Sequence, residues 1–149
     1  MRGSSPPPTH KVCINTAAGF KAGIEILLTG LDIEQKAAIF TDVFFESLGG
    51  REAFDKVETQ LIRTDRADAS QNEEAQASLR IYAHSKDPDR VGRLFSAKHI
   101  ELALANYPGF SSRSGSPGAP VIAYWPALVD SAHITERVHV DGTTIDVLP

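Results

Sequence analysis

The stretch of residues 19–50 changes its hydrophobic period halfway along, and this change constrains the fold more than any other feature of the chain. In residues 20–28 apolar and other residues alternate, which is the two-residue period of a strand with one buried face. In residues 33–48 the apolar side chains recur every three or four positions, as they do along one side of a helix. The sequence therefore predicts a strand that leads directly into an amphipathic helix.

The ends of this helix are marked by residues with known capping roles. Asp32 is placed to cap the first turn, with Gln35 three residues later in the reciprocal position. Gly49 and Gly50 supply a left-handed stop. A strand that feeds a capped helix is the opening half of a βαβ unit, so we expect strand and helix to pack on each other.

Residues before and after this unit add further strands and a second helix. Residues 10–16 alternate as a short strand, which we expect to turn through residues 17–19 and form a hairpin with the strand that follows. Two more alternating runs, residues 54–63 and 77–84, predict strands after the first helix. A second helix is expected to start at the Asp87 cap, with Pro88 in its first turn, and to run to about Asn106.

The last third of the chain is predicted to contain a loop, a strand and a hairpin. Residues 111–120 are rich in Ser, Gly and Pro and indicate a loop. Residues 121–129 favour a strand, but Pro126 cannot donate a ladder hydrogen bond, so this strand is expected at a sheet edge or with a bulge. Asp141-Gly142 between two alternating runs is a strong hairpin signal.

The predicted elements, set end to end, give the order ββαββαβ followed by a hairpin. The inner βαββαβ portion is the order of a ferredoxin-like two-layer α+β sandwich, with helices on one face of a mostly antiparallel sheet. An extra N-terminal strand and the C-terminal hairpin are added to this core. Residues 1–9 contain three consecutive prolines and are expected to form a stiff lead-in. Residues 10–149 are expected to form a single domain.

Composition narrows the range of partners. The chain has a formal net charge of −4 and its Lys and Arg residues do not cluster, so nucleic-acid binding is not expected. No apolar run is long enough for a membrane span, and the N-terminus lacks the hydrophobic core of a signal peptide. We expect a cytoplasmic protein that does not bind membranes.

A search for chemical motifs finds few candidates. The five histidines are scattered without metal-ligand spacing, and no nucleophile elbow, P-loop or dinucleotide fingerprint is present. The single cysteine, Cys13, lies between two apolar strand residues and is expected to be a buried thiol. The sequence therefore predicts no metal and no cofactor, and it leaves open whether the chain is an enzyme.

Two groups of residues remain as site candidates. Arg80, His84 and Arg93 are the candidate anion-binding or proton-handling groups, and the first two share one face of a predicted strand. The second group consists of two aromatic and proline clusters, which are either a docking surface or a small satellite core under the predicted loop. Their candidate partner-binding residues are Tyr107, Phe110, Tyr124 and Trp125.

Several segments, in order, resemble the C-terminal part of the acyclic terpene utilisation AtuA family: PPPTHKV, GLDIEQKA, SQNEEAQASLRIYA, DPDRVGRLF, ELALANYPGF and YWPALV. The resemblance extends from about Gly3 to Val138. It implies a link to the bacterial breakdown of isoprenoid alcohols such as citronellol and geraniol, and it brings no catalytic residue with it. It also implies a larger α/β region ahead of this one, so we expect the chain to be a separated C-terminal domain.

Two functions follow as hypotheses. In the first, the chain is an accessory or assembly domain without complete catalytic machinery, and it binds a protein partner, either the larger N-terminal region or a second copy of itself. In the second, it contributes anion-binding or proton-transfer residues to an enzyme site for a branched carboxylate or acyl-thioester intermediate. The small-molecule substrate is left open.

Overall fold

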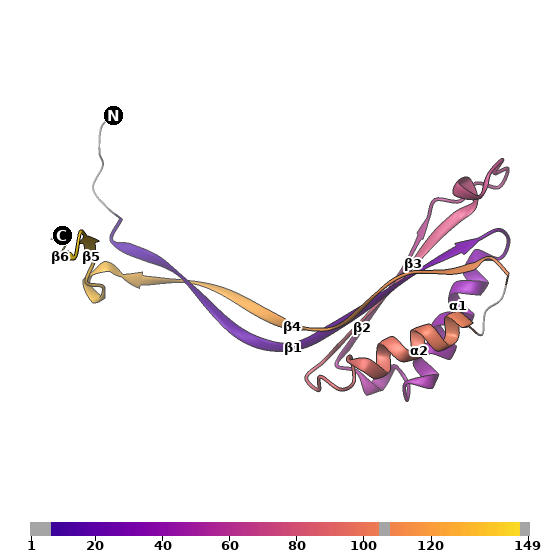
Figure 1. Cartoon of the computed structure of the whole chain (residues 1–149), viewed down its shortest axis with the longest axis horizontal. Coiled ribbons are helices and arrows are strands. Elements are labelled where there is room, and N and C mark those ends of the chain that lie inside the picture. Colours follow the sequence, from indigo (N-terminus) through magenta and orange to yellow (C-terminus); the bar gives the residue numbers. More distant parts are fainter. Residues whose placement is uncertain (1–6, 105–107, 147–149) are drawn as a thin grey trace. The chain divides into compact units, whose positions relative to one another are not determined.

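The structure is a computed structural model, and it describes residues 7–104 and 108–146 (Figure 1). Short 3-10 helices lie at Arg51–Ala53, Asn72–Ala75 and Ser131–His133. The main elements in chain order are β1 (Thr9–Thr29), α1 (Ile33–Ser47), β2 (Lys56–Arg63), β3 (Gln76–Ser85), α2 (Arg93–Leu104), β4 (Phe110–Asp130), β5 (Arg137–Val140) and β6 (Thr143–Asp146). Neither described helix is long and apolar enough to cross a membrane.

The chain forms two compact units, which are described separately. One is the core unit, Ala17–Val121. The other is the terminal unit, whose described residues are 7–16 and 122–146. The grouping of residues 10–149 into a single domain stays a prediction.

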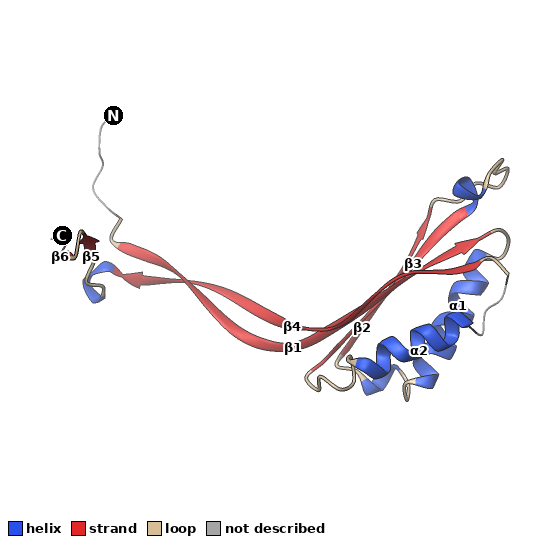
Figure 2. Ribbon diagram, viewed as in Figure 1, coloured by secondary structure: helices blue, strands red, loops and turns tan. Residues whose placement is uncertain are grey.

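The sheet of the core unit has the strand order β2-β3-β1-β4 (Figure 2). β3 pairs antiparallel with both of its neighbours, and its Ile81 lies opposite Ile24 of β1 and Thr59 of β2. The chain order βαββαβ combined with this strand order is the arrangement of a ferredoxin-like sandwich. The predicted α+β fold with a mostly antiparallel sheet is therefore confirmed.

Both helices lie against the same face of this sheet (Figure 1), and the core fills the space between the two layers. Along β3, buried and half-exposed residues alternate without interruption, because one face of the strand is covered by helices and the other is not. Phe44 of α1 is fully buried, and its ring centroid lies 5.0 Å from that of Phe95 of α2. This aromatic contact joins the two helices.

The boundaries of α1 show which capping predictions were correct. The predicted side-chain cap by Asp32 is not made, because Asp32 takes a left-handed conformation with φ of 58° and its side chain accepts no capping hydrogen bond. The left-handed stop is confirmed: Gly49 has φ of 91°, and the Gly50 amide donates to the Phe45 carbonyl at 2.8 Å.

The prediction of a separate N-terminal strand and hairpin was wrong. β1 runs without a break from Thr9 to Thr29, and the expected turn at residues 17–19 lies inside it. Gly19 has φ of 94°, and a Cβ added there would lie 2.8 Å from the Ser85 carbonyl oxygen. The glycine therefore lets β1 pass close to the end of β3 within a strand, and no chain reversal is needed.

The predicted loop at residues 111–120 was also wrong, because this segment is part of β4. The position of β4 explains the error. It is the edge strand of the four-stranded sheet, where prolines are tolerated because one row of backbone amides needs no partner. The edge location predicted from Pro126 is therefore confirmed.

The start of α2 differs from the prediction as well. Residues 88–92 form turns, and the helix begins at Arg93 rather than at Pro88. Asp87 still accepts a hydrogen bond from the Asp89 amide at 3.0 Å, so its carboxylate caps this turn instead of the helix. The expected helix end, Asn106, lies outside the described residues.

The terminal unit consists of the outer part of the β1–β4 ribbon and a separate hairpin. The Ser131 amide donates to the Pro8 carbonyl at 3.0 Å, which closes the ribbon at its end. β5 and β6 pair antiparallel, with Val138 opposite Ile145. Asp141 and Gly142 both have positive φ, 48° and 76°, as a type I′ turn requires, so the predicted hairpin is confirmed.

Candidate functional site

The described part of the terminal unit has no hydrophobic core. All buried residues in the described parts of the chain lie between Ala22 and Phe110, inside the core unit. The terminal unit nevertheless exposes nine large apolar side chains: Ile14, Ile122, Tyr124, Trp125, Leu128, Ile134, Val138, Val140 and Ile145. Exposed apolar surface that is this concentrated marks interaction sites in soluble proteins.

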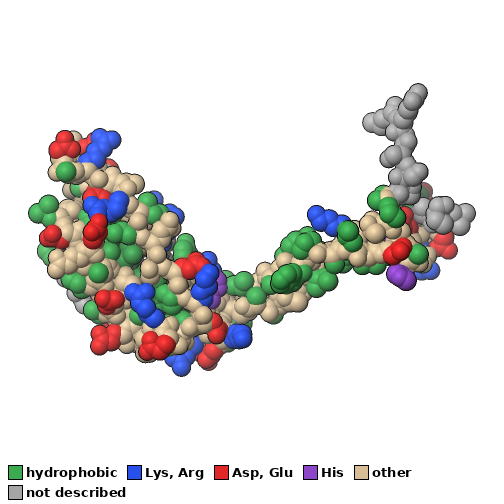
Figure 3. Space-filling model, turned by 180° about the vertical axis from the view of Figure 1, so that it is seen from behind, with side chains coloured by type: hydrophobic (Ala, Val, Ile, Leu, Met, Phe, Trp, Pro, Cys, Tyr) green, Lys and Arg blue, Asp and Glu red, His purple; other side chains and the backbone are tan. Residues whose placement is uncertain are grey.

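Tyr124 and Trp125 are the largest members of this surface. They are 52% and 65% exposed, and they sit in β4 next to Pro126. Figure 3 shows hydrophobic side chains gathered along the β1–β4 ribbon. Large, stiff aromatic side chains of this kind contribute much of the binding energy at protein interfaces.

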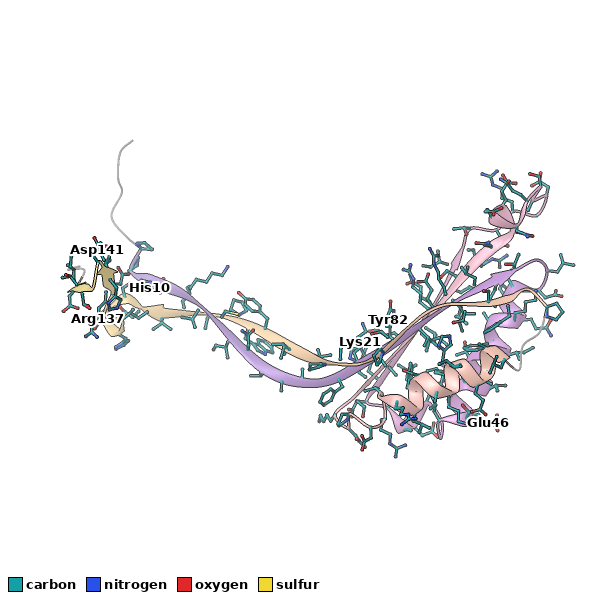
Figure 4. All side chains as sticks on the ribbon, in the orientation of Figure 1. His10, Lys21, Glu46, Tyr82, Arg137 and Asp141 are labelled. Atoms are coloured by element: carbon teal, nitrogen blue, oxygen red, sulfur yellow. The ribbon has the colours of Figure 1, made fainter. Side chains whose placement is uncertain are left out.

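The middle of the ribbon in the terminal unit also lacks charged residues. No charged residue occurs between Val12 and Thr16 or between Ile122 and Val129. The polar contacts at the ends of this unit join His10 to Glu136 at 3.3 Å and Arg137 to Asp146 at 3.0 Å. Figure 4 labels His10 and Arg137. Exposed strands usually carry charges that discourage pairing with other chains, and these two stretches do not.

The other two predicted partner-binding residues are placed differently. Phe110 is 9% exposed and belongs to the core, where its ring centroid lies 5.2 Å from that of Phe40. Tyr107 lies outside the described residues. The exposed aromatic surface is therefore carried by Tyr124 and Trp125.

Arg80 lies on the face of the core sheet that the helices leave uncovered. The Oε1 atom of Glu25 lies 3.4 Å from Nε of Arg80 and 3.7 Å from Nη1 of Arg113. Ser78 donates a hydrogen bond of 2.6 Å to the same oxygen. The Ser78 hydrogen bond, and then the two arginines, lower the pKa of the Glu25 carboxyl. Two cations thus share one carboxylate at this point of the sheet.

His84 lies on the same face of β3 as Arg80, four residues further along. It is opposite Lys21 on β1 and Lys56 on β2. The Lys21 ammonium lies 4.2 Å from the centre of the Tyr82 ring, which places it over this face (Figure 4). The uncovered face is therefore a polar surface of mixed charge.

Arg93 is not brought together with Arg80 and His84. It lies at the start of α2, in the helical layer on the opposite side of the sheet. There it lines a shallow surface hollow with Asp89, Leu94 and Ala97.

His99 is a buried titratable residue that sequence analysis did not single out. It is 4% exposed, and its Nε2 atom lies 2.9 Å from the Ser112 hydroxyl of β4. Burial lowers the pKa of its imidazole, so the ring is neutral at pH 7. The available signal was its position four residues after Phe95 on the buried side of α2.

The expected burial of the cysteine was wrong. Cys13 is exposed, because the strand around it belongs to a two-stranded ribbon with no helix packed over it. No group of three or more His, Cys, Asp or Glu side chains in the described parts of the chain is placed to hold a metal ion.

Comparison with known proteins gives one match. A family model described as "Acyclic terpene utilisation family protein AtuA" matches residues 1–140 of the 149-residue chain. No curated protein and no solved structure matches. Since the family match covers nearly the whole sequence, this chain belongs to the acyclic terpene utilisation AtuA family.

Proposed function

We propose that this chain is an assembly module of a protein that takes part in acyclic terpene utilisation. In this proposal the terminal unit binds the surface of another protein subunit, and the complete catalytic machinery lies outside this chain. Membership of the AtuA family supports the link to acyclic terpenes. The uncovered apolar surface of the terminal unit supports the assembly role.

The observation that carries the proposal is the contrast between the two units. The core unit buries two helices against a four-stranded sheet. The described part of the terminal unit consists of a two-stranded ribbon, a short 3-10 helix and a two-stranded hairpin, and all residues of β5 and β6 are exposed. Two-stranded structures are at best marginally stable in water without a third strand or a helix to cover them. A second protein surface would supply that cover.

Hydrogen exchange measured by mass spectrometry tests this proposal. In the monomeric chain the amides of residues 122–130 and 137–146 are expected to exchange within seconds, because few buried contacts hold these strands closed. The amides of β3 serve as the internal control and are expected to exchange orders of magnitude more slowly. On assembly with its partner the terminal unit is expected to become protected while β3 stays unchanged.

The decisive result is the rate of amide hydrogen exchange measured on the monomer. If the terminal unit of a verified monomer is as well protected as β3, it needs no covering partner and the assembly role falls. Replacement of Trp125 by Asp gives a second measure: assembly is expected to weaken by tenfold or more, as for a central aromatic contact. Leu104→Asp on α2, where the side chain is 84% exposed, is the matched control.

A second candidate function rests on the two arginines that share Glu25. Arg80 and Arg113 carry two positive charges against one carboxylate, and arginine is suited to bind carboxylate or phosphate oxygens. The uncovered sheet face would then hold the anionic end of a branched carboxylate or acyl thioester.

Titration calorimetry with geranate, a branched isoprenoid carboxylate, tests this second function. Arg80→Ala and Arg113→Ala are each expected to weaken binding about tenfold, the effect of losing one charge-assisted hydrogen bond. Arg137→Ala, which removes an exposed ion pair in the hairpin, is the control. Equal affinities of all three variants and the wild type would remove this candidate.

A further inference from the structure

We infer that the partner of the terminal unit is a second copy of this chain, and that the two copies pair through residues 10–18 of β1. The two β1 strands would run antiparallel about a two-fold axis and join their ribbons into one sheet of four strands. This inference rests on the assembly role proposed above and names the partner.

The outer edge of β1 is open over this segment. β3 occupies one side of β1, but its register begins only at Phe20, which lies opposite Ser85. β4 lies on the other side of β1. Residues 10–18 therefore have a strand partner on one side only, among the residues that the structure describes. Their outward amide and carbonyl groups are free to pair with an added strand.

The other edge of the same ribbon is protected. β4 contains Pro117, Pro120 and Pro126, and a proline cannot donate to a strand paired with it. Residues 10–18 contain no proline. Pairing of β1 with β4 of the next copy, which would continue into an open fibre, is therefore disfavoured. Pairing of β1 with β1 closes after two copies.

The lack of charged residues and the β-branched side chains of residues 12–18 both suit a two-fold contact between copies. The chain has a net charge of −4, so two copies approach best through an uncharged surface, and residues 12–18 carry no charge. When the two-fold axis is perpendicular to the sheet, side chains on one face of β1 lie on the same face of the joined sheet as the equivalent side chains of the second copy. With the axis at Cys13, Val12 of each copy lies opposite Ile14 of the other, and β-branched residues form favourable cross-strand pairs.

The exposed apolar surface of the terminal unit as a whole matches what one partner contributes to a standard interface. At their exposed fractions the nine apolar side chains of the terminal unit present on the order of 1,000 Å² per copy, against about 800 Å² per partner in a standard interface. Ile14 is the one of these nine side chains that lies within residues 10–18, so main-chain hydrogen bonds through β1 carry most of the proposed contact.

Sedimentation analysis of the full chain over a concentration series tests the inference. The wild type is expected to be a dimer at micromolar concentration. Ile14→Lys places two like charges beside the two-fold axis and is expected to weaken the dimer by a hundredfold or more. Ile100→Lys is the matched control: Ile100 is 59% exposed on α2, compared with 47% for Ile14, and its substitution is expected to leave the dimer intact.

The single cysteine gives an independent measure of register. Antiparallel pairing centred on Cys13 places this residue directly opposite its counterpart, and the thiol is exposed. A short bis-maleimide is therefore expected to link two copies covalently, and the product should disappear in Cys13→Ser and in Ile14→Lys.

The outcomes separate this inference from the proposed function. If the chain forms a dimer that Ile14→Lys does not weaken and that is not cross-linked through Cys13, β1 pairing is overturned but the assembly role remains. If the chain stays monomeric at all concentrations and the amides of its terminal unit exchange rapidly, a second copy is not the partner, but the assembly role remains. If the chain is monomeric and the amides of its terminal unit are protected from exchange, both the dimer and the assembly role are overturned.

Discussion

At the scale of the residue, His99 shows how burial sets a protonation state. Its imidazole is 4% exposed, and its Nε2 atom faces the Ser112 hydroxyl. A Cβ added at Gly115 would lie 3.1 Å from Nδ1 of this ring, so the glycine leaves room for the histidine beneath β4. The ring is fixed as a neutral partner of a serine within the core unit.

The first prediction concerns pH. The pKa of His99 lies below 6.5 in the folded chain and near 6.5 in the unfolded chain, so protons bind the unfolded state preferentially as the pH falls. Above pH 6.5 the ring is neutral in both states, so protonation of His99 does not lower the free energy of unfolding there. Below that pH the free energy of unfolding falls by up to about 1.4 kcal/mol per pH unit.

Urea unfolding at pH 7.5, 6.0 and 5.0 measures this loss. His99→Gln is expected to reduce the dependence on pH, because the group that titrates is gone. His133→Gln replaces an exposed histidine and should retain the wild-type dependence. Equal slopes for His99→Gln and the wild type would show that another group is responsible.

A second prediction uses two glycines with similar backbone angles. Gly49 has φ of 91° and open space where a Cβ would lie, whereas a Cβ at Gly109, with φ of 79°, would lie 2.1 Å from the Thr29 carbonyl oxygen. Gly49→Ala is expected to cost about 1 kcal/mol for its left-handed conformation. Gly109→Ala carries a backbone clash as well and is expected to cost roughly 3 kcal/mol. Denaturant unfolding of both variants gives the comparison, and equal losses would contradict the clash.

At the scale of the element, α1 is held by the residues on its buried side. Phe44 is fully buried, and its ring centroid lies 5.7 Å from Phe40, 5.5 Å from Phe45 and 5.0 Å from Phe95. Its neighbour Val43 is 42% exposed. The two residues are adjacent in sequence but lie on different sides of the helix.

The third prediction follows from this difference. Phe44→Ala removes a ring from a packed cluster and is expected to lower the free energy of unfolding by about 3–5 kcal/mol. Val43→Ala is expected to change it by less than about 0.5 kcal/mol, as for most surface substitutions. Thermal or urea unfolding checks both values, and a loss below 1 kcal/mol for Phe44→Ala would contradict the assignment of this ring to the core.

The elements also show how far sequence reasoning reached. Where one face of a segment is buried, as in β3 and α1, side-chain periodicity gave the element and its type. It failed in residues 111–120, because an edge strand rich in Ser, Gly and Pro has no buried alternation to detect. It failed again at residues 17–19, where the strand continues in a sheet whose other edge strand, β4, comes about a hundred residues later in the sequence.

The candidate site was predictable to a smaller extent. Tyr124 and Trp125 were recognised as a surface candidate, and the structure places both in the exposed ribbon. Phe110 was given the same role but packs on Phe40, because composition cannot distinguish an aromatic in a core from one on a surface. The pairing of Arg80 and Arg113 with one carboxylate could not be foreseen, as it joins three strands.

At the scale of the whole molecule, the single tryptophan reports on the terminal unit. Trp125 is 65% exposed, so in dilute solution its fluorescence is expected to be red-shifted and readily quenched by acrylamide. Assembly would bury the indole, and the emission should move to shorter wavelength as the concentration rises. Ile14→Lys is expected to hold the emission at its dilute value. A blue-shifted, protected tryptophan in the monomer would contradict the exposure of this surface.

The sequence by itself determined the local order of this protein: which segments alternate as strands, where the helices carry their apolar side, and where Gly49 and Asp141-Gly142 end or reverse the chain. These features depend on side-chain periodicity and backbone preference within a few residues. The tertiary structure alone decided that β1 and β4 continue into a ribbon without a core, that His99 is buried beneath β4, and that three strands meet at Glu25. These features depend on contacts between distant segments, which no local pattern encodes.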